Sequence, residues 1–336
     1  MNQQATQAPA ADVFSGSPGK ILAANGWDIR ALRPYIRPGK PLRANDLLSK
    51  DEWIAFDDAL VQVARRQLGA IEDLISAGLT LNLGSLGVLI SEYEALSTID
   101  LAEQSMSGVA PGQRDLATFT LNSVPVPITF RDFQLHLRYL EASRRGGSNI
   151  DTTNAELCAS RVNEKLEEVL FNGSTVSIGG SVQAGYTTAS SRITGSTTAD
   201  WGVATGEQIV GDALAMIADA ENENYFGQFM FYVPVSAMQN IRNDFKADSD
   251  KTILTRLEEI DAFQGIRGTT SLGASEVIAV RLTKDVVDIA IASPVTTVQW
   301  DEMGGMIQNF KVMAAMAPRI KIPASANAKT GLVHYS

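Results

Sequence analysis

The sequence contains a single cysteine, Cys158, and two histidines, His136 and His334, in 336 residues. One cysteine excludes an internal disulfide framework, and these three residues cannot supply the usual ligands of a structural zinc site. No stretch approaches the roughly 18 apolar residues that a membrane-spanning helix needs. The amino terminus also lacks the basic start and the apolar run of a signal peptide. We therefore expect a soluble protein that is not exported by that route, with no membrane partner, metal or cofactor.

Motifs for enzymatic chemistry are also scarce. A hydrolytic triad would need a histidine near a serine and a carboxylate, and no nucleophile-elbow sequence is present. Neighbouring carboxylates such as Glu167 and Glu168 point about 100° apart on a helix, which is typical of a solvated face. Residues 177–202 are rich in glycine, serine and threonine but lack the lysine of a phosphate loop. A flexible or hairpin connection is the simpler interpretation of that segment, and we predict that the protein is not an enzyme.

Charge is modest overall but unevenly distributed. The net charge of -10 argues against binding of nucleic acid by the protein surface as a whole. Between residues 14 and 45, however, Asp28 is the only anion, and Pro34, Pro38 and Pro41 favour an extended course. This segment is either a solvated arm that packs on its own domain, or an arm that lies on a neighbouring subunit or faces a polyanion. Its candidate contact residues are Arg30, Arg33, Arg37, Lys40 and Arg43.

A capped helix is predicted at residues 153–172. Thr153 and Glu156 have the capping-box spacing at its start. Gly173 can adopt the left-handed backbone conformation that ends a helix. Apolar residues recur between these caps at spacings of three and four, so one face of the helix should be buried and Cys158 should be a packed thiol. The expected packing residues are Cys158, Val162, Leu166, Val169 and Leu170.

Residues 88–128 are predicted to form a long two-stranded arm, because two extended segments flank a turn-rich tip. The arm follows a helix that should start near Ser49 and stop at Gly78. An isolated hairpin is marginal in water, and no covering helix follows in the sequence. We therefore expect the arm to rest on another copy of the chain. Its candidate assembly residues are Ile99, Leu101, Arg114, Leu116 and Phe119.

The remaining segments suggest a mixed sheet with helices packed on it. Residues 130–147 have the composition of an amphipathic helix, and Thr205 with Gln208 form a capping box for another helix. Turn signals and prolines separate the expected strands. These strands lie at 229–233, 276–282, 286–293, 296–300 and 307–323.

The order of these parts resembles that of the major capsid proteins of tailed bacteriophages and of the related encapsulin nanocompartments. The most similar stretch is "PVPITFRDFQLHLRYLEASRRGG", followed by a long helix that ends in "EEVLFNG". The resemblance covers about residues 50 to 323 and contains no invariant catalytic signature. It implies an α+β fold with an N-terminal arm, an extended two-stranded loop, a peripheral domain with a long spine helix, and an axial domain.

The resemblance also implies how the chain is divided. The implied segments are an N-terminal arm (1–48), a helix that starts the peripheral domain (49–87), the extended loop (88–128), the peripheral domain (129–200) with its spine helix (153–172), an axial domain (201–305) and a C-terminal strand that returns to the peripheral domain (306–336).

The function implied by the resemblance is structural. The chain would be the major capsid subunit of a tailed phage, forming pentamers and hexamers of an icosahedral shell around double-stranded DNA. Its partners would be many copies of itself, DNA bound nonspecifically on the inner face, and portal, scaffold or decoration proteins. It would be found in the virion capsid and assemble in the host cytoplasm. An encapsulin-type compartment around an enzyme cargo is the alternative, and a soluble enzyme of unknown chemistry is the third.

Some proteins of this family weld the shell with an isopeptide bond from a lysine of the extended loop. Here no lysine lies between Lys50 and Lys165. The extended loop therefore has no amine to offer. If the chain forms a shell, we expect that shell to be held together without this crosslink.

Overall fold

The structure is a computed structural model, and it describes residues 69–97, 104, 106, 116–139, 153–246, 250–323 and 328–336. The chain divides into two compact units. One comprises Met1–Asp57, Leu135–Ile150 and Asp301–Gln308, and the other comprises the rest. Among the described residues, no helix combines the length and the apolar character needed to cross a membrane.

The long helix α5 (Thr153–Asn172) has the bounds expected from its caps. It ends at Gly173, whose φ is +77°. A Cβ atom at this position would lie 2.6 Å from the carbonyl oxygen of Gln183, so only glycine fits the turn. The buried face of α5 packs against α3 (Gly69–Ser76) and against strands from the carboxyl-terminal part of the chain. This helix is the centre of the first core cluster, which includes Leu166, Val312 and Ala314.

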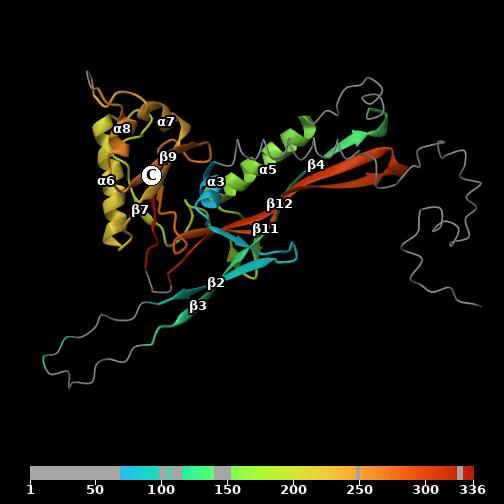
Figure 1. The fold of residues 1–336 in the computed structure, drawn as a ribbon, viewed down its shortest axis with the longest axis horizontal. Helices are drawn as coiled ribbons and strands as arrows, with labels where there is room; N and C mark the ends of the chain where they lie inside the picture. Colours follow the sequence, from blue (N-terminus) through green and yellow to red (C-terminus); the bar gives the residue numbers. More distant parts are fainter. Residues whose placement is uncertain are drawn as a thin grey trace, which may run out of the picture. The chain divides into compact units, whose positions relative to one another are not determined.

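A four-stranded sheet lies beside α5 and carries long strands (Figure 1). Its order is β1 (Thr80–Asn82), β11 (Val287–Glu302), β12 (Ile307–Ile320) and β4 (Ile128–His136). The 3-10 turn at Met303–Gly305 joins β11 to β12, and Gly304 and Gly305 both have positive φ there. The expectation of a turn at this place is confirmed.

A five-stranded sheet forms the second core. Its order is β7 (Ile193–Gly195), β13 (Leu332–Tyr335), β10 (Val277–Val280), β8 (Phe229–Pro234) and β9 (Phe263–Thr269). The helices beside it are α6 (Gly206–Asn222), α7 (Val235–Ile241) and α8 (Ile253–Glu258). The side chain of Gln208 accepts a hydrogen bond from the Thr205 N–H, which confirms the predicted capping box. Trp201, Met216 and Phe231 are buried between α6 and the sheet.

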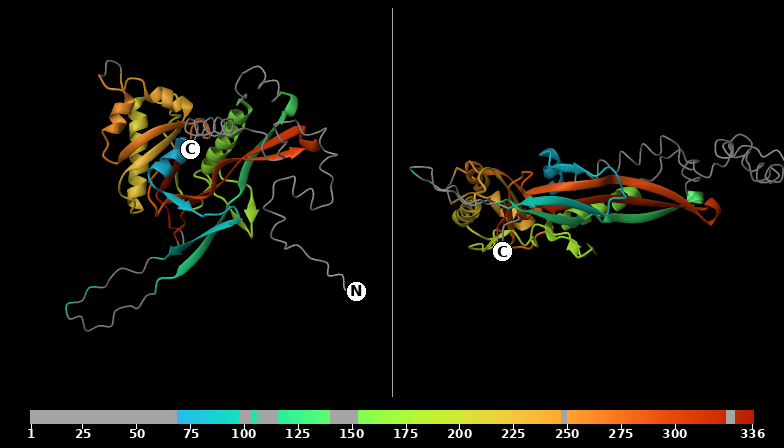
Figure 2. Two further views of the ribbon diagram at one scale, coloured as in Figure 1. Left: turned by 45° about the vertical axis from the view of Figure 1, so that its right-hand side comes forward. Right: turned by 90° about the horizontal axis from the view of Figure 1, so that it is seen from below.

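Two hairpins complete the fold. The larger pairs β2 (Ile90–Leu96) with β3 (Phe119–Pro125) in antiparallel register, from Ile90 opposite Pro125 to Leu96 opposite Phe119 (Figures 1 and 2). The smaller pairs β5 (Ser177–Ile178) with β6 (Ser181–Val182) across two glycines of positive φ. A hairpin was one of the two interpretations of this glycine-rich segment.

The prediction of a helix at residues 130–147 is wrong for its described part. Residues 128–136 form strand β4, and only residues 137–139 are helical. Tertiary pairing with β12 prevails over helix propensity here, and Phe133 stacks on Phe310 of β12 with ring centroids 4.9 Å apart. His136 therefore ends a strand, not a helix.

Two further expectations for the carboxyl half were also wrong. Residues 287–293 and 296–300 belong to one strand, β11, which continues through Pro294. Among the described residues, β1 pairs with β11 only as far as Ile291, so Pro294 removes no backbone donor from that pairing. In addition, residues 306–336 do not form a single returning strand. Their first strand, β12, belongs to the four-stranded sheet and packs in the core cluster of α5, as expected, whereas their end, β13, pairs with β10 and β7 in the five-stranded sheet.

Candidate functional site

The base of the larger hairpin is fastened to the core of the protein. Tyr93 of β2 and Val124 of β3 are buried, and they pack with Ala315 and Ala317 of β12. The strands place these side chains on one face because residues two apart in a strand point the same way. The hairpin therefore has a buried root, although it is a two-stranded ribbon.

A buried ion pair fastens the same root. Arg319 of β12 donates to Asp288 of β11 through Nε at 2.6 Å and Nη2 at 2.5 Å. Its Nη1 donates to the Ser91 hydroxyl of β2 at 3.0 Å. The Arg319 side chain is only 4% exposed. A bidentate arginine–carboxylate pair is a strong, directional contact, so this group ties three strands together at a defined geometry.

Tyr93 adds a second link at the end of β12. Its hydroxyl donates to the Ile320 carbonyl and accepts from the Ile322 N–H, each at 3.1 Å. Burial raises the pKa of Tyr93 above its ordinary value, so the hydroxyl stays protonated and can donate one hydrogen bond while it accepts the other. The Lys321 ammonium lies 5.1 Å from the ring centroid and 3.1 Å from the Asp288 carboxylate. The root is therefore a closed polar network with few alternative arrangements.

The distal end of the same hairpin is apolar and exposed. Leu96 stands opposite Phe119, and Leu121 is two residues further along β3, so all three lie on one face of the ribbon. Their exposed fractions are 56%, 70% and 60%. We call Leu96, Phe119 and Leu121 the distal apolar face. A cluster of exposed apolar side chains is typical of a protein–protein contact, and this one lies on a hairpin whose base is buried.

Comparison with known proteins places the chain in a family. A family model described as a family of unknown function (DUF6260) matches residues 43–335. This chain belongs to that family. The DUF6260 chain is 25% identical over 290 residues to the type 1 encapsulin shell protein EncA of Myxococcus xanthus, with 83% of this chain and 92% of that protein covered.

Solved structures show which fold the DUF6260 chain has. A virus-like particle from Pyrococcus furiosus superimposes with a TM-score of 0.61 at 16% identity, covering 85% of this chain and 99% of that one. The capsid of Myoviridae phage XM1 superimposes with a TM-score of 0.60 at 14% identity, covering 79% and 91%. The chain thus has the α+β fold shared by tailed-phage major capsid proteins and encapsulins, as the order of its parts suggested.

The predicted assembly residues of the DUF6260 chain are only partly described. Leu116 and Phe119 are exposed at the distal end of the larger hairpin. Outside the described residues lie Ile99, Leu101, Arg114, Arg30, Arg33, Arg37, Lys40 and Arg43. The spine-helix residues Cys158, Val162, Leu166, Val169 and Leu170 are all buried. Burial raises the pKa of the Cys158 thiol, which lowers its thiolate fraction and its reactivity.

Sequence reasoning missed the residues that anchor the hairpin. Arg319 and Asp288 each interrupt an apolar strand segment, and a charged residue inside such a run is a signal that it has a buried partner. Leu121 was missed because the strand alternation that exposes it depends on the register. Glu167 was wrongly assigned to a solvated face: it is half buried, and its carboxylate accepts from the Gly69 N–H at the start of α3 at 3.2 Å.

The described residues offer little for catalysis. His334 is buried in β13, where its Nδ1 accepts from Arg192 at 3.4 Å and burial lowers its pKa. Within the described ranges, no group of three histidine, cysteine or acidic side chains is placed to hold a metal ion. What the described residues do form is a surface: a hairpin with a buried base and an exposed apolar end.

Proposed function

We propose that this chain is the major capsid subunit of a tailed phage, and that it self-assembles into pentamers and hexamers of an icosahedral shell around double-stranded DNA. The observation that carries the proposal is the larger hairpin, with its buried root and its distal apolar face. The proposed role is structural, not enzymatic. The fold supports it, since that fold is shared with a phage capsid and with a virus-like particle.

Exposure of the distal apolar face to water is unfavourable. Its three side chains are 56–70% exposed, so covering each of them completely would gain about 1–2 kcal/mol. A two-stranded ribbon cannot provide that burial itself, because one face of each strand always points away from the root. A neighbouring copy can cover it, and in a closed shell the same contact is repeated at every subunit.

The partners follow from this role. The shell would consist of many copies of the chain, with portal, scaffold or decoration proteins as further components. DNA would be bound nonspecifically on the inner face. The N-terminal cations from Arg30 to Arg43 stay candidate contacts either for DNA or for a neighbouring subunit. The proposed location is the virion capsid, after assembly in the host cytoplasm.

An encapsulin-type compartment around an enzyme cargo is the second candidate function. One specific observation favours it: the curated relative from Myxococcus xanthus is an encapsulin shell protein, and the match covers 92% of that protein. Both candidates predict a closed shell from one chain. They differ in what the shell contains.

The deciding experiment is electron microscopy of the purified full-length chain, together with an assay for nuclease-protected nucleic acid in the same particles from the native host. Closed shells that protect long DNA support the phage capsid. Closed shells with a protein cargo and no DNA support the compartment. Subunits that stay monomeric under all conditions overturn both.

The role of the distal apolar face can be tested separately. Leu121→Ser with Phe119→Ser should leave a folded subunit, because both side chains are exposed, but should abolish closed shells. The matched control is Val203→Ser, an apolar residue outside the hairpin that is 82% exposed. Normal shells from the hairpin variant would refute the role assigned to this face.

A further inference from the structure

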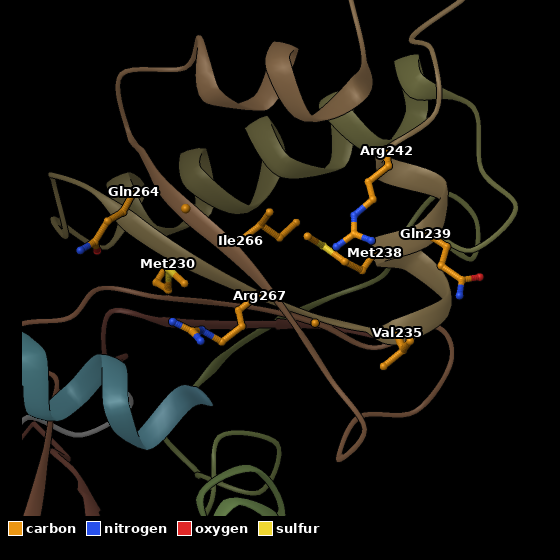
Figure 3. Close-up of a pocket in the computed structure, with 10 residues that line it drawn as sticks. Met230, Val235, Met238, Gln239, Arg242, Gln264, Ile266 and Arg267 are labelled. Carbon is orange, nitrogen blue, oxygen red and sulfur yellow. The ribbon is translucent and has the colours of Figure 1, made fainter. Parts of the chain in front are cut away.

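A groove runs along the edge strand of the five-stranded sheet. It has a volume of about 620 Å³ and is lined by residues of β8, β9 and α7 (Figure 3). Gly265 and Gly268 of β9 leave room for methionines: a Cβ atom there would lie 3.3 Å from Met230 Sδ and from Met238 Cβ, respectively. The polar side chains of the lining are Gln239, Arg242, Gln264 and Arg267.

The groove carries uncompensated positive charge. Arg267 pairs with Asp73 of α3 at 2.6 Å, and Asp73 also accepts from the Tyr232 hydroxyl at 3.1 Å. Arg242 is exposed, and it forms no ion pair within the part of the chain that the structure describes. None of the described residues that line the groove is acidic. The Arg242 guanidinium, with glutamine amides and methionines in the same groove, suits a carboxylate on a protein surface.

The carboxyl end of α6 carries the opposite charge. Helix α6 packs against β7 and β13 of the same sheet, whereas the groove lies along β9. Glu221 and Glu223 are exposed at the carboxyl end of α6. Neither has an ion-pair partner among the described residues. Asp219 in the same turn differs from them, because it is half buried and accepts from the Tyr335 hydroxyl at 2.6 Å. The two glutamates are therefore the carboxylates that this helix end presents outward.

These two glutamates are not explained by the stability of their own helix. The carboxyl end of a helix is the negative end of its dipole, so a carboxylate there is unfavourable. The last turn of α6 contains no basic residue that would offset this cost. A pair of acidic residues that weakens its own helix is expected where it serves a contact elsewhere.

We propose that the groove of one subunit receives the exposed carboxylates of α6 from the next subunit in a ring, with Arg242 as the principal contact and Glu221 and Glu223 as its partners. This inference rests on the proposed function, because it requires that copies of the chain assemble. The two surfaces are different patches of one subunit, so the contact is head-to-tail. A contact of this kind closes into rings when the rotation between subunits permits.

Crosslinking through introduced cysteines tests the contact directly. The natural cysteine, Cys158, is buried, so Gln239→Cys combined with Glu221→Cys in the full-length chain provides the reactive pair. A short thiol–thiol crosslinker added to assembled particles should give a covalent ladder of multimers. Gln239→Cys combined with Lys165→Cys is the control, because Lys165 is exposed on α5 and belongs to neither surface, and it should stay monomeric on a denaturing gel.

The outcomes separate this inference from the proposed function. A ladder from the first pair alone supports the contact. Closed shells that give no ladder, or the same ladder from the control pair, overturn the contact and leave the shell function in place. Failure of the unmodified chain to form any shell overturns the proposed function itself.

Charge reversal provides an independent readout. Arg242→Glu places like charges together and should lower the yield of closed shells at least about tenfold. Adding Glu221→Arg to the same chain should restore the yield, whereas Lys165→Glu on α5, which makes the same change in net charge, should leave it unaltered. The contact is refuted if Arg242→Glu assembles like the wild type, or if the double variant assembles no better than Arg242→Glu.

Discussion

The buried ion pair at the root of the larger hairpin predicts a large and specific loss of stability when one partner is removed. Arg319→Met keeps much of the volume of the side chain but leaves Asp288 buried without its bidentate partner. Breaking a buried pair in this way costs about 3–5 kcal/mol. Lys321, whose ammonium is 3.1 Å from the same carboxylate, offsets part of this cost. We therefore expect the lower end, about 3 kcal/mol.

The measurement is urea unfolding of the unassembled subunit, followed by tryptophan fluorescence at one protein concentration. A loss of about 3 kcal/mol with a slope near 3 kcal/mol per molar lowers the midpoint by about 1 M. Arg319→Met combined with Asp288→Leu should recover most of the loss, because an apolar pair can replace a buried ion pair at little cost.

An exposed arginine–aspartate pair serves as the matched control, because it has the same charges as the buried pair but is in contact with water. Arg281 pairs with Asp285 at 3.4 Å, but the Asp285 side chain is 58% exposed. Arg281→Met should therefore cost less than about 1 kcal/mol. The ion pair does not hold the root of the hairpin if Arg319→Met lowers the free energy of unfolding no more than Arg281→Met does. The same conclusion follows if Arg319→Met with Asp288→Leu loses as much as the two single variants added together.

Further variants test the helices and their packing. Leu166→Asp buries an unpaired charge and should cost several kcal/mol in urea unfolding, whereas Leu157→Asp, on the exposed face of the same helix, should cost less than about 0.5 kcal/mol. Gly173→Ala should cost at least about 1 kcal/mol, because its positive φ and the nearby carbonyl forbid a Cβ atom. Gly211→Ala, in α6 with nothing within 4 Å, should instead stabilise by about 0.5–1 kcal/mol. Burial raises the pKa of Glu167 above 4.5, so its contribution to folding is fully present below its unfolded pKa and is lost as the pH rises through the folded pKa. Stability measured from pH 4 to 7 should therefore fall less steeply in Glu167→Gln than in the wild type, and identical profiles would contradict the burial of this carboxyl.

The local elements with strong end signals could be predicted from the sequence. The bounds of α5 follow from Thr153 and Gly173, and the start of α6 follows from Thr205 and Gln208, because caps and left-handed glycines act within one turn of chain. The existence of the larger hairpin could also be predicted, since a turn-rich tip between extended segments is a local pattern.

The elements whose conformation depends on distant partners could not be predicted from the sequence. β4 contains residues with helical periodicity, yet it is a strand because β12 lies beside it. The distal apolar face depends on the pairing of Leu96 with Phe119, and a shift of one residue would turn every side chain to the other face.

The amino-acid sequence by itself determined the long capped helix and the start of α6, because helix caps act through contacts within a few residues. The order of its parts pointed to the fold class only through a resemblance to a known family. Only the tertiary structure decided that Arg319, Asp288 and Ser91 meet, although Ser91 and Arg319 are 228 residues apart in the chain. It also decided that residues of β8, β9 and α7 line one groove. Both features depend on which strands become neighbours, and strand order is settled by packing of the whole core and not by any local pattern.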